Sequence, residues 1–340
     1  MNVLITCAGR RNYLVNWFRE PLQGRGRVIA VDASPNAPAL IAADAAFVVP
    51  PLDHPDYLDR LLAICAEQQV GLLISLNDFE LPLISHNQER FRAVGTRPAI
   101  SSPDVIHTCL DKWKTYEFLR AQGIPTARTF LTVESVQDAL SRGEIDFPLA
   151  IKPRCGSGSA GMVYVRNAVE LRLTHALAID QQSRLPGHRG LMPASGALVF
   201  QEWLEGEEYG LDVVHDLEGV YAGCFARRKL LMRAGETDRA VTTEHSGLRQ
   251  LALQLSRALG HIGNLDCDVF VQEDRCTVLE MNPRFGGGYP FSHLAGANLP
   301  RALVAWHLGE PVDPGWLTPR PDVMGAKHDG VALISPSGVL

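Results

Sequence analysis

The chain has 340 residues, a formal net charge of −6 and a charged fraction of 21%. This length predicts two or three packed units rather than one, and the mild acidity gives no support for binding to nucleic acid or to a membrane surface. No apolar run reaches the roughly 18 residues that a membrane helix needs, and the segment 1–6 favours a first strand over a signal peptide. The seven scattered cysteines form no Cys-x-x-Cys pair, which is typical of reduced, buried thiols in a cytoplasmic protein.

Residues 1 to about 100 alternate apolar strand runs with helical patterns. We expect strands at 3–6, 28–32, 46–49 and 71–76, and helices at 13–23 and 56–69. This alternation predicts an α/β domain with a parallel, doubly wound sheet. Asp32 ends the second strand, as the ribose-binding acid does in dinucleotide folds, but the first loop has the single glycine Gly9 instead of Gly-x-Gly-x-x-Gly. An NAD(P)-dependent oxidoreductase is therefore a minor alternative.

Polar side chains follow the strand at 71–76. Asn77, Asp78 and Glu80 come just past its carboxyl end, where open α/β sheets place their ligands. Acids in such loops are also common as solvated groups or helix caps, so a substrate-facing role for Asp78 and Glu80 is one of two open interpretations.

The organisation changes at residues 101–125. The run from Ser101 to Asp104 is typical of a helix start, with Asp104 placed to satisfy early N–H groups. A second helix carries Lys112 and ends at Gly123, after which strand density rises. The first domain is therefore predicted to end near residue 100.

A glycine-rich hairpin is predicted at residues 147–166. Gly156, Ser157, Gly158 and Gly161 lie between two strand-like runs, whereas a dinucleotide fingerprint needs a strand, a loop and then a helix. Lys152 precedes the glycines, which is the reverse of the protein-kinase order, and the chain contains no Gly-x4-Gly-Lys-Ser/Thr P-loop. A lysine inside an apolar strand needs a partner, so we expect Lys152 to bind phosphate beneath a flexible flap.

Two charged stretches follow. Residues 197–214 read as a strand, a short connector and a strand, with Glu202, Trp203, Leu204 and Glu208 in or near the connector. Such a connector is compatible with contacts to a nucleotide, although an exposed acidic turn is the more common case. Residues 225–245 are dense in charge, and five cations there are either anion ligands or solvated groups: Arg227, Arg228, Lys229, Arg233 and Arg239.

The most informative stretch is the predicted hairpin at residues 263–288. Side chains alternate between the faces of a strand, so Asp266 and Asp268 share one face of the first strand, while Glu280, Asn282 and Arg284 share one face of the second. Oxygen ligands of this kind suit Mg²⁺ together with nucleotide oxygens. An arginine beyond them is placed to offset charge on a transferred phosphoryl group.

The order of these features resembles the ATP-grasp superfamily, most closely its carbamoyl-phosphate-synthase-like and amino-acid ligase branch. The resemblance rests on Lys112, on Lys152 before the glycines, on the run 201–204 with Glu208, and on the run 280–284. It implies an α/β plus α+β fold. A Rossmann-like parallel sheet, the pre-grasp domain, covers residues 1–100, and two α+β ATP-grasp subdomains cover residues 101–195 and 196–340.

The resemblance also implies a role for each matching residue. Lys112 and Lys152 contact the nucleotide phosphates beneath the flap of Gly156, Ser157, Gly158 and Gly161. The adenine edge is met by Glu202, Trp203 and Leu204, and the ribose by Glu208. Mg²⁺ or Mn²⁺ is held by Glu280 and Asn282 with Asp268 or Asp266. Arg284 is catalytic with Lys152 and Arg233, and the substrate side comprises Asp78, Glu80, Arg233, Arg284 and Gly287.

The implied activity is an ATP-dependent carboxylate–amine ligase that forms an acyl phosphate and releases ADP and phosphate, with an amino acid as a substrate. A carboxy-phosphate enzyme like carbamoyl phosphate synthase is an alternative, although the chain is too short for that enzyme's duplicated halves. The implied setting is cytoplasmic, without nucleic-acid or membrane partners, and a homodimer is possible.

Overall fold

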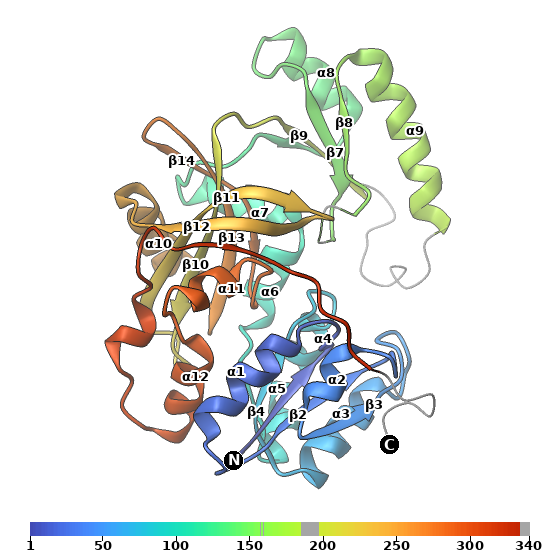
Figure 1. The fold of residues 1–340 in the computed structure, drawn as a ribbon. Helices are drawn as coiled ribbons and strands as arrows, with labels where there is room; N and C mark the ends of the chain where they lie inside the picture. Colours follow the sequence, from blue (N-terminus) through green and yellow to red (C-terminus); the bar gives the residue numbers. More distant parts are fainter. Residues whose placement is uncertain (157, 159, 185–196, 334–340) are drawn as a thin grey trace.

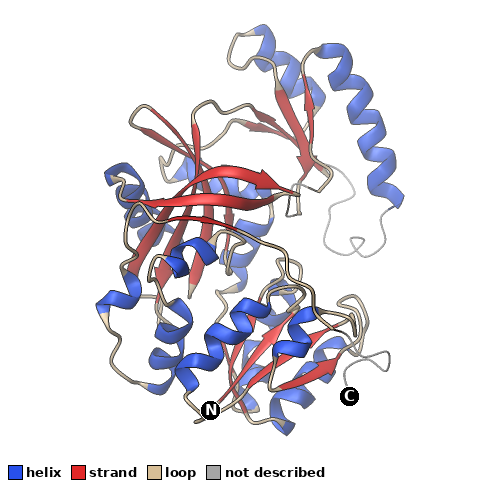
Figure 2. Cartoon of the chain, viewed as in Figure 1, coloured by secondary structure: helices blue, strands red, loops and turns tan. Residues whose placement is uncertain are grey.

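The computed structural model describes residues 1–156, 158, 160–184 and 197–333, which form three sheets with flanking helices (Figures 1 and 2). Among the described residues, no helix is both long enough and apolar enough to cross a membrane. All seven cysteines are free thiols, and four of them are buried: Cys65, Cys109, Cys155 and Cys267.

The N-terminal domain is built on a parallel sheet with strand order β3-β2-β1-β4-β5. Its strands are β1 (Asn2–Thr6), β2 (Val28–Asp32), β3 (Ala45–Val48), β4 (Val70–Ser75) and β5 (Arg97–Pro98). Its helices are α1 (Asn12–Leu22), α2 (Pro38–Ala42), α3 (Tyr57–Glu67), α4 (Leu81–His86) and α5 (Gln88–Ala93). Val3 and Ile5 pack into one apolar cluster and Leu4 into another, because successive side chains leave opposite faces of β1. This arrangement confirms the predicted doubly wound α/β domain.

A four-stranded antiparallel sheet, in the order β6-β9-β7-β8, forms a smaller unit. Its strands are β6 (Thr129–Phe130), β7 (Leu149–Pro153), β8 (Val163–Val165) and β9 (Leu198–Glu202), and its helices are α8 (Val133–Ser141) and α9 (Ala168–Arg184). β9 lies beyond the expected boundary at residue 195, yet it pairs with β7 of the smaller sheet. In terms of its sheet, this unit therefore extends to Glu202.

The larger sheet has the order β14-β13-β10-β11-β12-β15. Its strands are β10 (Glu207–His215), β11 (Tyr221–Arg233), β12 (Glu236–Thr243), β13 (Asn264–Gln272), β14 (Arg275–Asn282) and β15 (Met324–Ala326). The segments around it are α10 (Ser246–Leu259), α11 (Tyr289–Leu294), α12 (Leu299–Leu308) and the 3₁₀ helix η1 (Pro314–Leu317). Every pair of neighbouring strands is antiparallel, which confirms the expected second α+β subdomain.

The helices between the first two domains pack on the larger sheet. They are α6 (Pro103–Leu110), capped by Ser102 where the sequence favoured Asp104, and α7 (Lys112–Ala121), capped by Asp111. Cys109 and Leu119 share an apolar cluster with Val278 of β14. These helices therefore belong by packing with the C-terminal sheet, although the sequence analysis grouped them with the small subdomain.

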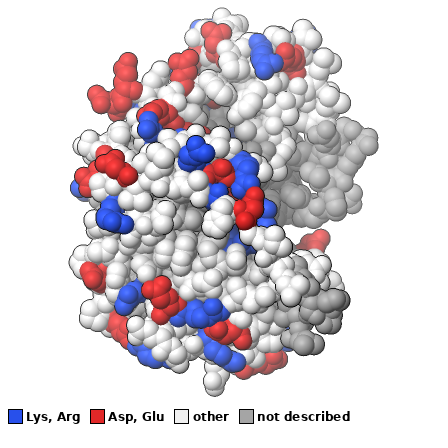
Figure 3. All heavy atoms as spheres, viewed as in Figure 1, with Lys and Arg blue, Asp and Glu red and all other residues white. Residues whose placement is uncertain are grey.

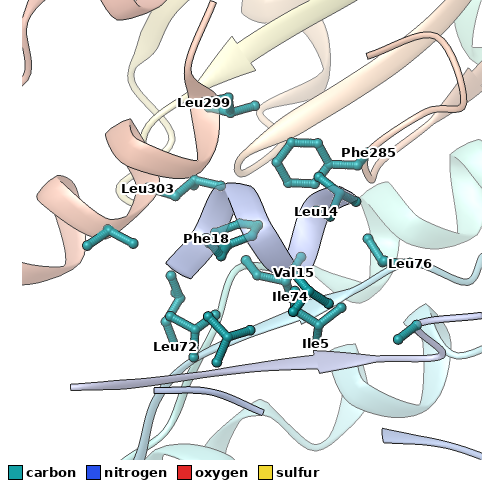
Figure 4. Close-up of a cluster of buried hydrophobic side chains, with 14 of the residues drawn as sticks. Ile5, Leu14, Val15, Phe18, Leu72, Ile74, Leu76, Phe285, Leu299 and Leu303 are labelled. Carbon is teal, nitrogen blue, oxygen red and sulfur yellow. The ribbon is translucent and has the colours of Figure 1, made fainter. Parts of the chain in front are cut away.

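The N-terminal domain and the C-terminal helices share one apolar cluster. Phe18 of α1 packs with Phe285, Leu299 and Leu303 (Figure 4). Burying a large apolar side chain of this kind contributes about 1.5–3 kcal/mol. The packing joins the N-terminal domain to the glycine-rich loop after β14, so it fixes both walls of the cleft described next.

Candidate functional site

A cleft of about 300 Å³ lies between the N-terminal domain and the larger sheet. One wall comes from the loop after β4 and from Arg11, and the other comes from β11–β14 and the glycines after β14. Most of its lining side chains are charged or polar. Those used below are Arg11, Asp78, Arg227, Lys229, Glu236, Asp266, Asp268, Glu280, Asn282 and Arg284.

The hairpin of β13 and β14 brings the predicted metal ligands together. Asp268 lies opposite Glu280 in the strand register, and Asp266 lies opposite Asn282. All four line the cleft with Arg284. Strand alternation therefore placed these side chains on the face that the cleft uses.

Two lysines from separate segments approach Glu280. The Nζ of Lys112, at the first residue of α7, lies 3.7 Å from Glu280 Oε2 and donates a hydrogen bond of 2.6 Å to the carbonyl of Gly156. Lys152 on β7 is 6% exposed, and burial lowers its pKa to about 8 in spite of the nearby Glu280. Burial alone would raise the pKa of Glu280, but Lys112, Lys152 and Arg284 outweigh it and lower that pKa.

Two arginines with little exposed side chain, Arg227 and Arg284, line the cleft. Arg227 is 1% exposed and pairs with Asp212 and with Asp266, at 2.8 Å from the latter. Arg284 pairs with Asp78 at 2.8 Å and lies 3.6 Å from Asp266. Burial lowers the pKa of each arginine, but these carboxylates outweigh it and raise that pKa above its usual value. Asp266 is thus held between two guanidinium groups.

Lys229 joins two of the predicted ligand positions. Its Nζ lies 2.6 Å from both Glu208 and Asp268. Burial would lower its pKa, but the two carboxylates raise it. Removing this lysine would leave two partly buried carboxylates without their cation, which is costly.

The glycine-rich segment meets the turn between β11 and β12. Gly158 lines the large cleft, and Gly156 lines a smaller hollow beside Lys112 and Glu280. A Cβ on Gly235 would lie 2.1 Å from the carbonyl oxygen of Gly158, so only glycine fits there. Gly161 packs on Pro153, and Ser157 lies outside the described residues.

The predicted adenine-edge residues lie apart from the cleft lining. Glu202 accepts a hydrogen bond from the backbone N–H of Arg128 at 2.7 Å. Trp203 is 47% exposed and meets Tyr164 of β8 edge-on, with ring centroids 5.0 Å apart. Leu204 follows in the connector before β10. Only Glu208, through Lys229, is linked directly to the cleft.

Two predicted substrate residues, Glu80 and Arg233, do not line the described cleft. Glu80 is fully buried and accepts hydrogen bonds from Thr6, Ser75 and Tyr57, so its carboxylate is used inside the N-terminal domain. Arg233 is half exposed and pairs with Asp238 and with the exposed Asp329. The register of β11 is irregular between Lys229 and Met232, which changes the alternation of its side chains. Met232 therefore lines the cleft where regular alternation would have placed Arg233. Gly287 does line the cleft.

The sequence analysis missed Arg11 and Glu236 as cleft residues, and it left Arg227 and Lys229 undecided. Arg227 and Lys229 are two residues apart on β11 and face the cleft together. Strand alternation could have separated this pair from Arg228, whose side chain is 41% exposed and pairs with Glu207 instead. Arg11 follows β1, a position where parallel sheets place ligands.

The donor set fits a magnesium ion. Among the described residues, no group of three or more His, Cys, Asp or Glu side chains forms a protein-only metal cage. Mg²⁺ usually takes one or two carboxylates and completes its shell with water and phosphate oxygens. Asp268 and Glu280, paired across the hairpin beside Asn282, are a set of this kind.

Comparison with known proteins agrees with this geometry. Residues 3–99 match the family described as PylC-like, N-terminal domain, and residues 109–288 match the ATP-grasp domain. The chain belongs to the ATP-grasp family. This result confirms the resemblance seen in the sequence.

The relatives are distant. The chain is 28% identical over 199 residues to the uncharacterized protein y4rH of Sinorhizobium fredii, covering 54% of this chain and 38% of that protein. It is 24% identical over 250 residues to the carbamoyl phosphate synthase large chain of Synechocystis, covering 68% of this chain and 22% of that one. The chain thus spans well under half the length of these relatives.

Solved structures share the fold. A biotin carboxylase complex from Campylobacter jejuni superposes with a TM-score of 0.72 at 18% identity, covering 94% of this chain and 73% of that one. An ADP complex of N5-carboxyaminoimidazole ribonucleotide synthetase superposes with a TM-score of 0.70 at 14% identity, covering 92% and 78%. This likeness confirms the predicted architecture.

Proposed function

We propose that the chain is an ATP-dependent carboxylate–amine ligase that forms an amide through an acyl phosphate, with an amino acid as a substrate. The observation that carries the proposal is the convergence of Lys112, Lys152 and Arg284, from three separate segments, on Glu280 at the cleft. A carboxylate and a triphosphate repel each other, so bringing them together needs several fixed cations. The NAD(P) alternative has less support, because the Asp32 carboxylate already accepts hydrogen bonds from the N–H groups of Gly9 and Ser34.

The proposed roles follow from these contacts. Lys112 and Lys152 bind the phosphates beneath the glycine-rich segment, and Arg284 stabilises the charge on the transferred phosphoryl group. The connector at 202–204 takes the adenine, with Glu208 on the ribose. Asp268, Glu280 and Asn282 hold Mg²⁺, which when bound neutralises phosphate charge. We assign Asp268 rather than Asp266 to the metal, because Asp268 lies directly opposite Glu280 in the strand register. Each aspartate already has a cationic neighbour, since Lys229 contacts Asp268 while Arg227 and Arg284 contact Asp266.

The proposal is tested by ADP release with MgATP and the amino acids, singly and in pairs. Hydroxylamine added to the reaction should trap the acyl phosphate as a hydroxamate. An arm with bicarbonate and ammonia tests carboxy-phosphate chemistry, which is the alternative. Formation of AMP, or no nucleotide turnover with any acid and amine, would show that the proposal is wrong.

Two lysines on one helix provide a matched pair of variants. Lys112→Gln should lower kcat/KM for ATP by about 100-fold, because a fixed cation on the phosphates is lost. Lys114→Gln removes an exposed lysine from α7 and should leave the rate unchanged. Equal rates in the two variants would contradict the proposed phosphate site.

A homodimer remains a proposal of the same kind. The biotin carboxylase domain of Hydrogenobacter thermophilus is described as a dimer. It shares this fold with a TM-score of 0.71 at 18% identity, and the match covers 92% of this chain and 70% of that one. Light scattering of the purified chain measures its mass directly, and a monomer at micromolar concentration would contradict this.

A further inference from the structure

Among the described residues, four cationic side chains line the cleft, and they differ in the distance to their nearest carboxylate oxygen. Arg227, Lys229 and Arg284 each have a carboxylate oxygen within 2.8 Å. For Arg11 the nearest carboxylate among the described residues is Glu236, with Nη2 and Oε1 4.0 Å apart, which is too long for a hydrogen bond. Within the described part of the cleft, Arg11 is therefore the cation best able to bind a further anion.

The backbone holds Arg11 in place. It is the residue before α1, at the end of the loop that follows β1. Its side chain is 26% exposed, so it is reachable but not freely solvated. Tyr13 lies beside it; burial raises the pKa of this tyrosine and Arg11 opposes the rise. Arg11 thus reaches the cleft from the N-terminal wall.

Glu236 faces Arg11 from the opposite wall. It is the first residue of β12 and its side chain is 44% exposed. Lys327 lies 2.9 Å from Oε2, while Oε1 is the atom nearer to Arg11. A Cβ on Gly287 would lie 3.4 Å from the Glu236 carboxyl carbon, so this carboxylate lies over the glycine-rich loop. Figure 3 shows positive and negative side chains intermixed near the middle of this face of the molecule.

Glu236 is charged at neutral pH. Burial would raise its pKa, but Lys327 and Arg11 outweigh that effect and lower it. The cleft therefore presents a guanidinium and a carboxylate side by side, close together but not hydrogen-bonded to each other. A ligand that carries both charges on neighbouring atoms matches this pair.

We propose that Arg11 and Glu236 form a subsite for the head group of an α-amino acid, with Arg11 binding the α-carboxylate and Glu236 the α-amino group. Both contacts are charge-assisted hydrogen bonds, which are the stronger kind. Leu76, Phe79 and Met232 line the same cleft and offer apolar contacts to the side chain of the amino acid.

This subsite rests on the proposed ligase function and extends it to the amine substrate. In this proposal the carboxylate on Arg11 serves recognition, and a second substrate supplies the carboxylate that attacks ATP. The proposed phosphate-binding residues Lys112 and Lys152 belong to the ATP-grasp segments. The amine substrate is therefore an amino acid with a free α-carboxylate.

The test measures binding directly. The full chain with MgADP is titrated calorimetrically with the twenty L-amino acids and with the decarboxylated amine of each one that binds. We expect at least one amino acid to bind and its decarboxylated amine to bind at least tenfold more weakly. Arg11→Gln and Glu236→Gln should each weaken binding of the amino acid by about 10- to 100-fold, as expected for a lost charged hydrogen bond.

Controls separate a lost contact from a damaged fold. Arg10→Gln changes the neighbouring exposed arginine, which does not line the cleft and has a smaller effect on the pKa of Glu236 than Arg11 has, so it should weaken binding far less than Arg11→Gln. MgADP affinity should be unchanged in all three variants. If Arg11→Gln lowers the melting temperature, Arg11→Lys keeps the charge and should recover part of the amino-acid affinity.

The outcomes distinguish this inference from the ligase function. Amino-acid binding that depends on Arg11, without any ADP release, would support the subsite and refute the ligase. ADP release with amines while no amino acid binds would refute the subsite and leave the ligase standing. Equal binding to the wild type and Arg11→Gln, or equal binding of an amino acid and its decarboxylated amine, also overturns the subsite.

Discussion

Three consecutive glycines after β14 differ in what an added methyl group would meet. A Cβ on Gly286 would lie 2.0 Å from the carboxyl carbon of Asp266, and a Cβ on Gly288 would lie 2.3 Å from Nε of Arg227. On Gly287 the nearest atom, in Glu236, is 3.4 Å away. Replacing each glycine with alanine in turn therefore compares two severe clashes with one ordinary contact in the same loop.

The expected cost follows from what has to move. Asp266 and Arg227 are buried and paired with each other, so neither can swing into solvent. Overpacking typically costs 1–3 kcal/mol, and breaking a buried ion pair typically costs 3–5 kcal/mol. We expect Gly286→Ala and Gly288→Ala each to lower the free energy of unfolding by about 3 kcal/mol or more. For Gly287→Ala we expect about 1 kcal/mol or less, as for other mild substitutions.

Urea unfolding followed by circular dichroism measures these differences through the transition midpoint at constant slope. The backbone of Gly288 has φ −89°, so alanine is not strained there and the clash alone carries the prediction. If Gly286→Ala and Gly288→Ala unfold at the same urea concentration as Gly287→Ala, the packing of the buried ion pair against this loop is refuted.

Three further predictions concern charge. Burial lowers the pKa of Lys152 to about 8, so the affinity of the chain for ATP should fall as the pH rises above about 8. Lys152→Arg should remove this loss of affinity. The same dependence of ATP affinity on pH in the wild type and in Lys152→Arg would contradict this prediction. Burial lowers the pKa of His261 from 6.5 to about 3. The unfolded chain alone therefore gains this proton between these pH values, so the free energy of unfolding should fall on acidification from about pH 6.5 to 3, by up to about 1.4 kcal/mol per pH unit. If the free energy of unfolding of His261→Gln falls equally steeply over this pH range, His261 is not the group responsible. Asp78→Asn should cost about 1–3 kcal/mol and lower kcat for ADP release, because Arg284 loses its shortest ion pair and the next carboxylate, Asp266, is 3.6 Å away. Recovery of kcat by Asp78→Glu would support a positioning role, and an unchanged kcat would exclude it.

Local patterns in the sequence determined much of the architecture. Alternation of strands and helices indicated the parallel N-terminal sheet, and the order of Lys152, the glycines and the run 280–284 indicated the ATP-grasp fold. Alternation also placed Asp268 and Glu280 on faces that meet, because antiparallel neighbours with period-2 side chains bring like faces together.

Contacts between distant segments were decided only by the tertiary structure. Glu80 has the same sequence signal as Asp78, yet one is buried among hydroxyl groups and the other pairs with Arg284 across the cleft. Arg11 and Glu236 are 4.0 Å apart, although they come from two domains. Periodicity reports which face of an element a side chain occupies; the partner of that side chain depends on how the domains pack, which local pattern does not encode.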